Sequence, residues 1–217
     1  LSDNMIVDSV IFHNSSVSVN HSNDELKVLL GTTLITGLFD SIEIYYHGSP
    51  VNSISGSWFL SDHGQGPVLS TLSEPYGARD WWPCKQNLND KIDSIDIYVQ
   101  TSDQYKVASN GILIEKIPSP GNELIHHWKH QYPITTYLIA ISVSNYSEFS
   151  SYYVKPSGDS LEILNYCYPQ SLSQWQTQIQ NTIDAMVFFD SLLGEYPFSK
   201  EKYGHAQFGW GGGMEHQ

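Results

Sequence analysis

The spacing of apolar residues changes once along this chain, near residue 168, and that change constrains the fold most. Before it, apolar and polar residues alternate in short runs, such as 42–46 and 95–99. Turn sequences such as Asn110-Gly111 and Pro156-Ser157-Gly158-Asp159 separate these runs. A continuous apolar run, 138–143, suits a strand that is buried on both faces. Short strands at about ten-residue spacing predict an antiparallel β-sandwich over residues 1–167.

After Pro169 the apolar residues recur at steps of three and four, which indicates a helix with one apolar face. They are Leu172, Trp175, Ile179, Ile183, Met186, Val187 and Leu193. Ser171 or Ser173 is suited to cap the start, and Gly194 is suited to end the helix. A single helix after about ten strands predicts a second domain, so we divide the chain into residues 1–167 and 168–217.

The composition excludes several classes of protein. With 40% hydrophobic and 13% aromatic residues, the chain is not an intrinsically disordered one. Ten basic against 23 acidic residues give a net charge of −13, which excludes binding to nucleic acid or to an anionic membrane through bulk charge. No apolar run has the length of a membrane span. The low share of charged residues, 15%, favours a periplasmic or secreted protein, with a cytoplasmic one as the alternative.

The run His126-His127-Trp128-Lys129-His130 has two interpretations. In a strand, its first, third and fifth side chains share a face, which would suit a metal site. The interpretation we favour is a half-exposed strand with solvent-facing histidines. Cys84 and Cys167 suit either free buried thiols or one long-range disulfide, and the sequence leaves both open.

Two other stretches carry more chemistry. Residues 73–84 combine Glu74, Arg79, Trp81, Trp82 and Cys84 with two prolines, an unusual density for a plain loop. At the other end of the chain, three glycines at 211–213 precede a methionine and a glutamate. Glycines let a ligand's backbone approach closely, and a carboxylate nearby can bind a cation.

Taken together, these stretches resemble the aminopeptidase N family of zinc metallopeptidases from about Val17 to Gln217. The resemblance rests on Glu74…Ala78-Arg79…Pro83-Cys84, the Tyr137–Val143 run, Tyr196-Pro197-Phe198 and Gly212-Gly213-Met214-Glu215. The last of these matches the family's Gly-x-Met-Glu-Asn motif, with His216 in place of the final Asn.

The resemblance implies a mainly β fold. A saddle-like N-terminal β-sandwich, whose first strands are expected before Leu1, leads into the first helix and strand of a truncated thermolysin-like α/β domain. The family's zinc ligands, in a His-Glu-x-x-His sequence and a distant Glu, follow the glycine motif and are expected after Gln217. We therefore expect zinc in the full-length protein, and no zinc, no catalytic residue and no hydrolysis in residues 1–217 alone.

The resemblance also implies substrate-binding residues. Glu74 and Glu215 would bind the free α-amino group of a peptide, and the backbones of Gly212 and Gly213 would lie along the peptide next to Met214. Two acceptor-only carboxylates explain why a free N-terminus is required, because a blocked one leaves both without a donor. Arg79, Trp81 and Trp82 would only support Glu74.

Two other functions fit the sequence. One is a non-catalytic relative of this family that acts as a binding or scaffold β-domain. The other is a carbohydrate-binding sandwich in which Trp81 and Trp82 form a stacking platform.

Overall fold

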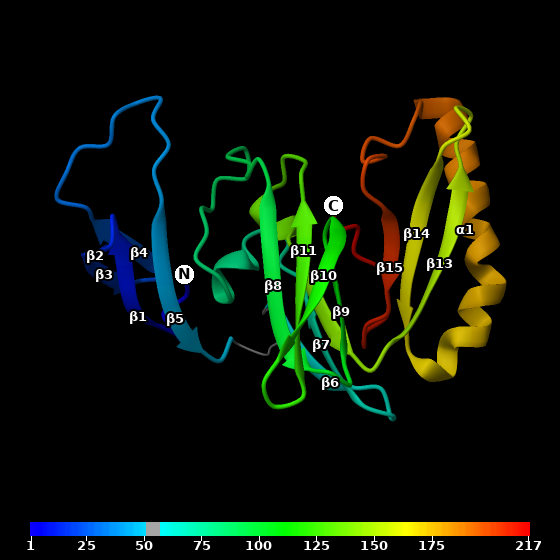
Figure 1. Cartoon of the computed structure of the whole chain (residues 1–217), viewed down its shortest axis with the longest axis horizontal. Coiled ribbons are helices and arrows are strands. Elements are labelled where there is room, and N and C mark those ends of the chain that lie inside the picture. Colours follow the sequence, from blue (N-terminus) through cyan, green and yellow to red (C-terminus); the bar gives the residue numbers. More distant parts are fainter. Residues whose placement is uncertain (51–56) are drawn as a thin grey trace.

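A computed structural model of the chain describes residues 1–50 and 57–217. The fold is mainly β, with one α-helix in the described part of the chain, near its C-terminal end. In Figure 1 the elements follow one another along the long axis. The N-terminal strands occupy one end, the next strands form the centre, and the helix closes the other end. The predicted β-rich architecture with a single late helix and a following strand is confirmed.

The N-terminal end consists of a three-stranded antiparallel sheet and a separate hairpin. The sheet has the order β2-β1-β5, and the hairpin joins β3 to β4. Their bounds are β1 Met5–Phe12, β2 Ser15–Ser16, β3 Ser18–Ser22, β4 Glu25–Leu29 and β5 Ile42–Gly48. β5 is the strand predicted from the alternating run 42–46.

Two antiparallel sheets form the centre, with the orders β10-β11-β8 and β6-β7-β12-β9. The bounds of the first are β8 Ile95–Ser102, β10 Ile112–Ser119 and β11 Glu123–His130. Those of the second are β6 Trp58–Asp62, β7 Pro67–Thr71, β9 Lys106–Ser109 and β12 Ile141–Ser144. β8 confirms the alternating run 95–99, since its first five residues alternate between half-buried and exposed.

The prediction of a continuous strand over residues 138–143 is wrong for the first residues of that range. Thr136–Leu138 form a short 3-10 helix, η2, and strand pairing begins only at Ile141. The cause is Asn110, whose side chain donates to the carbonyl of Leu138 at 2.9 Å and accepts from the amide of Ala140 at 2.7 Å. These contacts occupy backbone groups that a longer strand would use for its ladder.

The remaining sheet has the order β13-β14-β15, and its last pair is parallel. The strands are β13 Ser147–Val154, β14 Ser160–Cys167 and β15 Tyr203–Ala206. The helix α1, Leu172–Leu193, links the two parallel strands and lies on the outer side of this sheet (Figure 1). The predicted domain boundary at residue 167 coincides with the end of β14 and divides this sheet, and it stays a prediction.

The predicted helix is confirmed in its extent. It follows a 3-10 turn, η3 Pro169–Ser171, and ends at Gly194, whose φ of 88° is one that glycine adopts without strain. The expected cap is absent, because the Ser171 side chain makes no capping hydrogen bond. Met186 is the buried residue of the helix, and it packs in one core cluster with Tyr153, Leu161 and Ile163.

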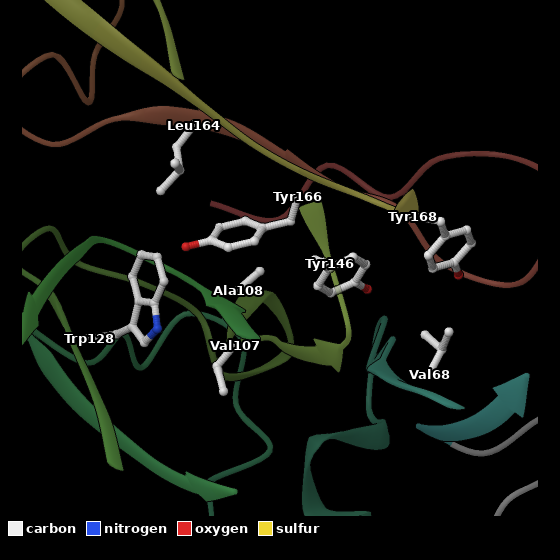
Figure 2. Packing of buried hydrophobic residues seen from close by; sticks show 8 residues of the cluster. All are labelled: Val68, Val107, Ala108, Trp128, Tyr146, Leu164, Tyr166 and Tyr168. Atoms are coloured by element: carbon white, nitrogen blue, oxygen red, sulfur yellow. The ribbon is translucent and has the colours of Figure 1, made fainter. Parts of the chain in front are cut away.

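A larger core cluster joins the central sheets to β14 (Figure 2). Its members are Val68, Val107, Ala108, Trp128, Tyr146, Leu164, Tyr166 and Tyr168. The Trp128 ring meets the edge of the Tyr166 ring at a centroid distance of 6.4 Å. The Tyr146 hydroxyl, buried in this cluster, donates to the carbonyl of Gln207 at 2.6 Å, which ties the chain after β15 to the centre.

Both cysteines are free thiols, Cys84 half-buried and Cys167 buried, so the disulfide alternative is not realised. Among the described residues, no helix combines the length and the apolar character needed to cross a membrane.

Candidate functional site

A cavity of about 790 Å³ lies where the central sheets meet β15 and the C-terminal segment. Its walls come from the ends of β7, β9 and β12, from β15 and from residues 207, 208 and 210–217. Figure 1 shows this C-terminal segment, in red, between β15 and the central strands. Aromatic side chains contribute much of the wall: Tyr166, Trp175, Tyr196, Phe198, Tyr203, Phe208 and Trp210.

The glycine-rich segment lines this cavity. Gly212, Gly213, Met214 and Glu215 all contribute to its wall, as does Gly211. Gly212 has a φ of 122°, and a Cβ there would lie 2.9 Å from the Trp210 ring, so this position requires glycine. A Cβ at Gly213 would meet nothing within 4 Å, so its backbone is open to a ligand. The structure therefore brings four of the five predicted site residues to one cavity.

Glu74, the fifth, is exposed and is not among the residues that line the cavity. It follows β7 by three residues, and Thr71 and Leu72 before it do line the cavity. Its neighbour Ser73 is buried, and the carbonyl of Ser73 accepts a bond of 2.9 Å from the amide of Gly77. That bond leads into a short 3-10 helix, η1 Gly77–Asp80, so the backbone next to Glu74 is fixed on both sides.

The residues expected to support Glu74 make contacts with neighbouring parts of the protein. Trp81 donates from its indole nitrogen to the hydroxyl of Ser73 at 3.0 Å, and Arg79 pairs with Asp24 at 3.4 Å. The Trp81 and Trp82 rings are tilted by 53° to each other and are half-buried. Trp81 also packs against Trp58 of β6 at a centroid distance of 6.0 Å, and this tilted cluster does not suit the flat stacking platform of a carbohydrate site.

The two residues after Glu215 attach the segment to the central sheets. The buried ring of His216 faces the backbones of Thr71 and Leu138, and burial lowers its pKa. The carbonyl of Gln217 accepts a bond of 2.5 Å from the amide of Asn110. His216, which departs from the family motif, therefore acts here as an anchor on the strand that leads to Glu74.

The histidine run lies in β11, but the solvent-facing interpretation is wrong. His126 and His130 are each 1% exposed and Trp128 is fully buried, because this face of β11 is covered by the core and by the chain before β15. The Nδ1 atom of His130 lies 2.5 Å from Oε2 of Glu201, which is itself 3% exposed in its side chain. Both residues line the cavity.

Sequence reasoning missed Glu201 and the residue next to it, Lys202. The ammonium of Lys202 donates to the carbonyl of Ser109 at 3.1 Å, and desolvation lowers its pKa to about 8. His205, three residues further on in β15, hydrogen-bonds Asn165 at 2.9 Å and has a pKa lowered by burial. The available signal was three consecutive charged residues, 200–202, directly before a short strand in a chain that has few charges.

The cavity can bind a cationic group at the Glu215 carboxylate, beside an open glycine backbone and aromatic walls. Within residues 1–50 and 57–217, no three His, Cys, Asp or Glu side chains converge as metal ligands would.

Comparison with known proteins identifies a family model and several solved structures that match this chain. The family model of the Peptidase M1 N-terminal domain matches residues 5–138. No curated protein sequence matches significantly. Among solved structures, a mutant M1 zinc metallopeptidase from Deinococcus radiodurans bound to the substrate Tyr-Ser-Ala is similar with a TM-score of 0.76 and 18% identity. The match covers 93% of this chain and 46% of that one.

A second structure, Legionella pneumophila aminopeptidase A in complex with aspartic acid, has a TM-score of 0.74 and 21% identity. Here the match covers 90% of this chain and 23% of that one. The chain thus spans less than half the length of both solved proteins, and at these identities the likeness shows a common fold.

Proposed function

Because the chain belongs to the M1 peptidase family through its N-terminal domain, we propose that it recognises the free α-amino group of peptide substrates for a zinc aminopeptidase. The full-length protein would remove N-terminal amino acids from peptides. Residues 1–217 would supply the binding of the amine and of the first peptide backbone, and would be inactive alone.

The observation that carries this proposal is the position of Glu215 with the glycines before it. Its carboxylate and the open backbone of Gly213 line the same cavity. An ionised carboxylate only accepts hydrogen bonds, so it pairs with an ammonium and not with an acetylated amine, which offers one donor and no charge. Hydrogen bonds to charged groups contribute about 1.5–3 kcal/mol, or roughly 10- to 150-fold in affinity.

Glu74 would be the second carboxylate on the amine. Its exposure leaves it free to turn towards a bound substrate, and a single residue, Ser73, separates it from the cavity wall at Leu72. The Ser73 contacts to Gly77 and Trp81 would hold its backbone while the side chain moves.

The described residues do not offer the set of ligands that a zinc ion needs, because no three His, Cys, Asp or Glu side chains converge among them. We therefore place its ligands in a part of the full-length protein outside residues 1–217, and assign no catalytic residue within them. Peptide and amino-acid ligands are present in the two similar structures, and this supports peptides with a free N-terminus as the substrate class.

The test uses the full-length protein with an aminoacyl anilide and its N-acetylated form as substrates. We expect one bound zinc and cleavage of the free-amine substrate alone. Glu215→Gln should lower kcat/KM for that substrate at least tenfold, and Glu74→Gln should act in the same direction. The matched control is Glu25→Gln, an exposed glutamate of β4 that pairs with Lys27 of the same strand.

Equal cleavage of both substrates, or unchanged kinetics in Glu215→Gln, would contradict amine recognition. Absence of both zinc and cleavage would instead favour the non-catalytic scaffold, in which the same fold is kept as a binding domain. Residues 1–217 expressed alone should bind no zinc and release no product, and one tightly held equivalent of zinc would contradict that expectation.

A further inference from the structure

We propose that His130, Glu201 and Asn110 are positioning residues that fix the end of the glycine-rich segment, and thereby Glu215, over the cavity. This inference rests on the proposed function only for its kinetic consequence. The geometric claim concerns residues 211–217 and stands on contacts within this chain.

The first step is the buried pair of His130 and Glu201. Oε2 of Glu201 lies 2.5 Å from Nδ1 of the histidine, and Oε1 accepts a bond of 2.6 Å from the amide of Gln131. Both carboxylate oxygens are thus occupied, and the two side chains are 1% and 3% exposed. A carboxylate that binds one ring nitrogen of a histidine sets the ring orientation and presents the other nitrogen in a defined role.

The second step is what that other nitrogen meets. Nε2 of His130 lies 3.2 Å from the side-chain amide nitrogen of Gln217. The same amide nitrogen donates to the carbonyl of Pro133 at 3.1 Å. With the Nδ1 proton directed at Glu201, Nε2 accepts the second amide hydrogen, so both donors of the Gln217 side chain are used.

Asn110 holds the same residue from its other side. Its amide nitrogen donates to the carbonyl of Gln217 at 2.5 Å and to that of Leu138 at 2.9 Å, and its oxygen accepts from Ala140. Asn110 is 4% exposed, so this contact is protected from water. Gln217 is therefore bound at its backbone by the turn between β9 and β10 and at its side chain by the end of β11.

The position of Gln217 limits that of Glu215. Two residues of extended chain span at most about 7 Å, so a fixed Gln217 confines the Glu215 backbone to a small volume. His216 adds a third attachment between them, at Thr71 and Leu138. If the Glu215 carboxylate is held loosely, the site binds an ammonium more weakly, because ordering the carboxylate on binding then costs free energy.

The test compares Glu201→Gln and Gln217→Ala with a matched control in the full-length protein. Glu201→Gln keeps the side-chain shape but removes one acceptor oxygen, and Gln217→Ala removes the link to His130. The control, Glu195→Gln, breaks an ion pair of 3.0 Å with Lys155, and neither of these two residues lines the cavity.

A readout that does not depend on activity is the methyl NMR signal of methionine. Residues 1–217 contain three methionines, of which Met214 lies in the segment while Met5 and Met186 are buried elsewhere. In both variants the Met214 signal should narrow and move towards its position in an unfolded chain, while Met5 and Met186 stay unchanged. An unchanged Met214 signal, or a change of all three signals together, would overturn the positioning role.

The kinetic readout is a double-mutant cycle with Glu215→Gln. Alone, each positioning variant should raise KM for the free-amine substrate at least fivefold with a smaller change in kcat. In the Glu215→Gln background the same changes should have no further effect, because the group they position is already lost. Additive effects would overturn the proposal. If the protein is not a peptidase, the proposed function fails and the NMR result still decides the geometric claim.

Discussion

The ammonium of Lys202 lies 5.1 Å from the centre of the Trp128 ring and donates to the carbonyl of Ser109. These two contacts connect the start of β15 to the ends of β9 and β11 in the middle of the core. These contacts do not fully compensate the Lys202 ammonium for its lost hydration, because desolvation still lowers its pKa to about 8 from the ordinary 10.5.

This lowered pKa predicts a pH dependence of stability. Between about pH 8 and 10.5 the unfolded chain holds a proton on this lysine that the folded chain has released. Because the unfolded state then binds more protons, this group makes the free energy of unfolding rise as pH rises through that window. Below pH 8, burial of the charged Lys202 ammonium lowers the free energy of unfolding by at most about 3 kcal/mol.

Lys202→Met should therefore raise the free energy of unfolding at pH 7 by about 1–3 kcal/mol and remove the rise between pH 8 and 10.5. Urea unfolding at pH 7, 8.5 and 10 measures both effects, with the exposed Lys200→Met as control. A destabilised variant at pH 7 would show that the Trp128 and Ser109 contacts outweigh the desolvation.

A second prediction concerns the attachment of the helix α1. Met186 is 9% exposed and packs against Tyr153, Leu161 and Ile163, whereas Leu192 on the same helix is 64% exposed. Met186→Ala should lower the free energy of unfolding by about 2–4 kcal/mol through lost burial and a cavity. Leu192→Ala should change it by less than about 0.5 kcal/mol. Thermal unfolding of the two variants measures both effects. Equal destabilisation by the two changes would contradict the packing of α1 through its Met186 face.

A third prediction concerns the turn between β9 and β10. Gly111 has a φ of 73°, and a Cβ there would lie 1.9 Å from the carbonyl oxygen of Lys129 in β11. Gly111→Ala should therefore cost more than about 3 kcal/mol or prevent folding, since backbone must move. Gly121→Ala is the matched control, because its φ is 87° but its Cβ would meet nothing within 4 Å. It should cost only about 1 kcal/mol, the strain of the left-handed backbone.

A fourth prediction concerns thiol reactivity. Burial raises the pKa of the Cys84 thiol to about 11 and also raises that of Cys167. Because the thiolate is the nucleophile, iodoacetamide at pH 8 should alkylate both residues much more slowly in the folded protein than in urea. Mass spectrometry of the intact protein counts the modified thiols. Rapid alkylation of Cys84 in the native state would show that its loop opens.

The spacing of apolar residues along the chain is regular enough in places to predict individual strands and the helix. The alternation at 42–46 and 95–99 and the three-and-four spacing after Pro169 predicted two strands and the full extent of α1. Backbone periodicity determines which residues share a face, so these elements follow from neighbouring residues alone. The glycine motif ending in Glu215 was recognised in the same way, as a contiguous stretch.

Only the tertiary structure decided what the other polar residues do. His130 and Glu201 are 71 positions apart, and nothing near either residue indicates that they pair or that the histidine is buried. Lys202 likewise reaches Ser109 and Trp128 through the packing of β15 beside the central sheets. A buried charge needs a partner, and that partner is chosen by which strands the topology brings together. Local sequence thus determined the elements and the motif, while long-range packing determined the network that holds the motif in place.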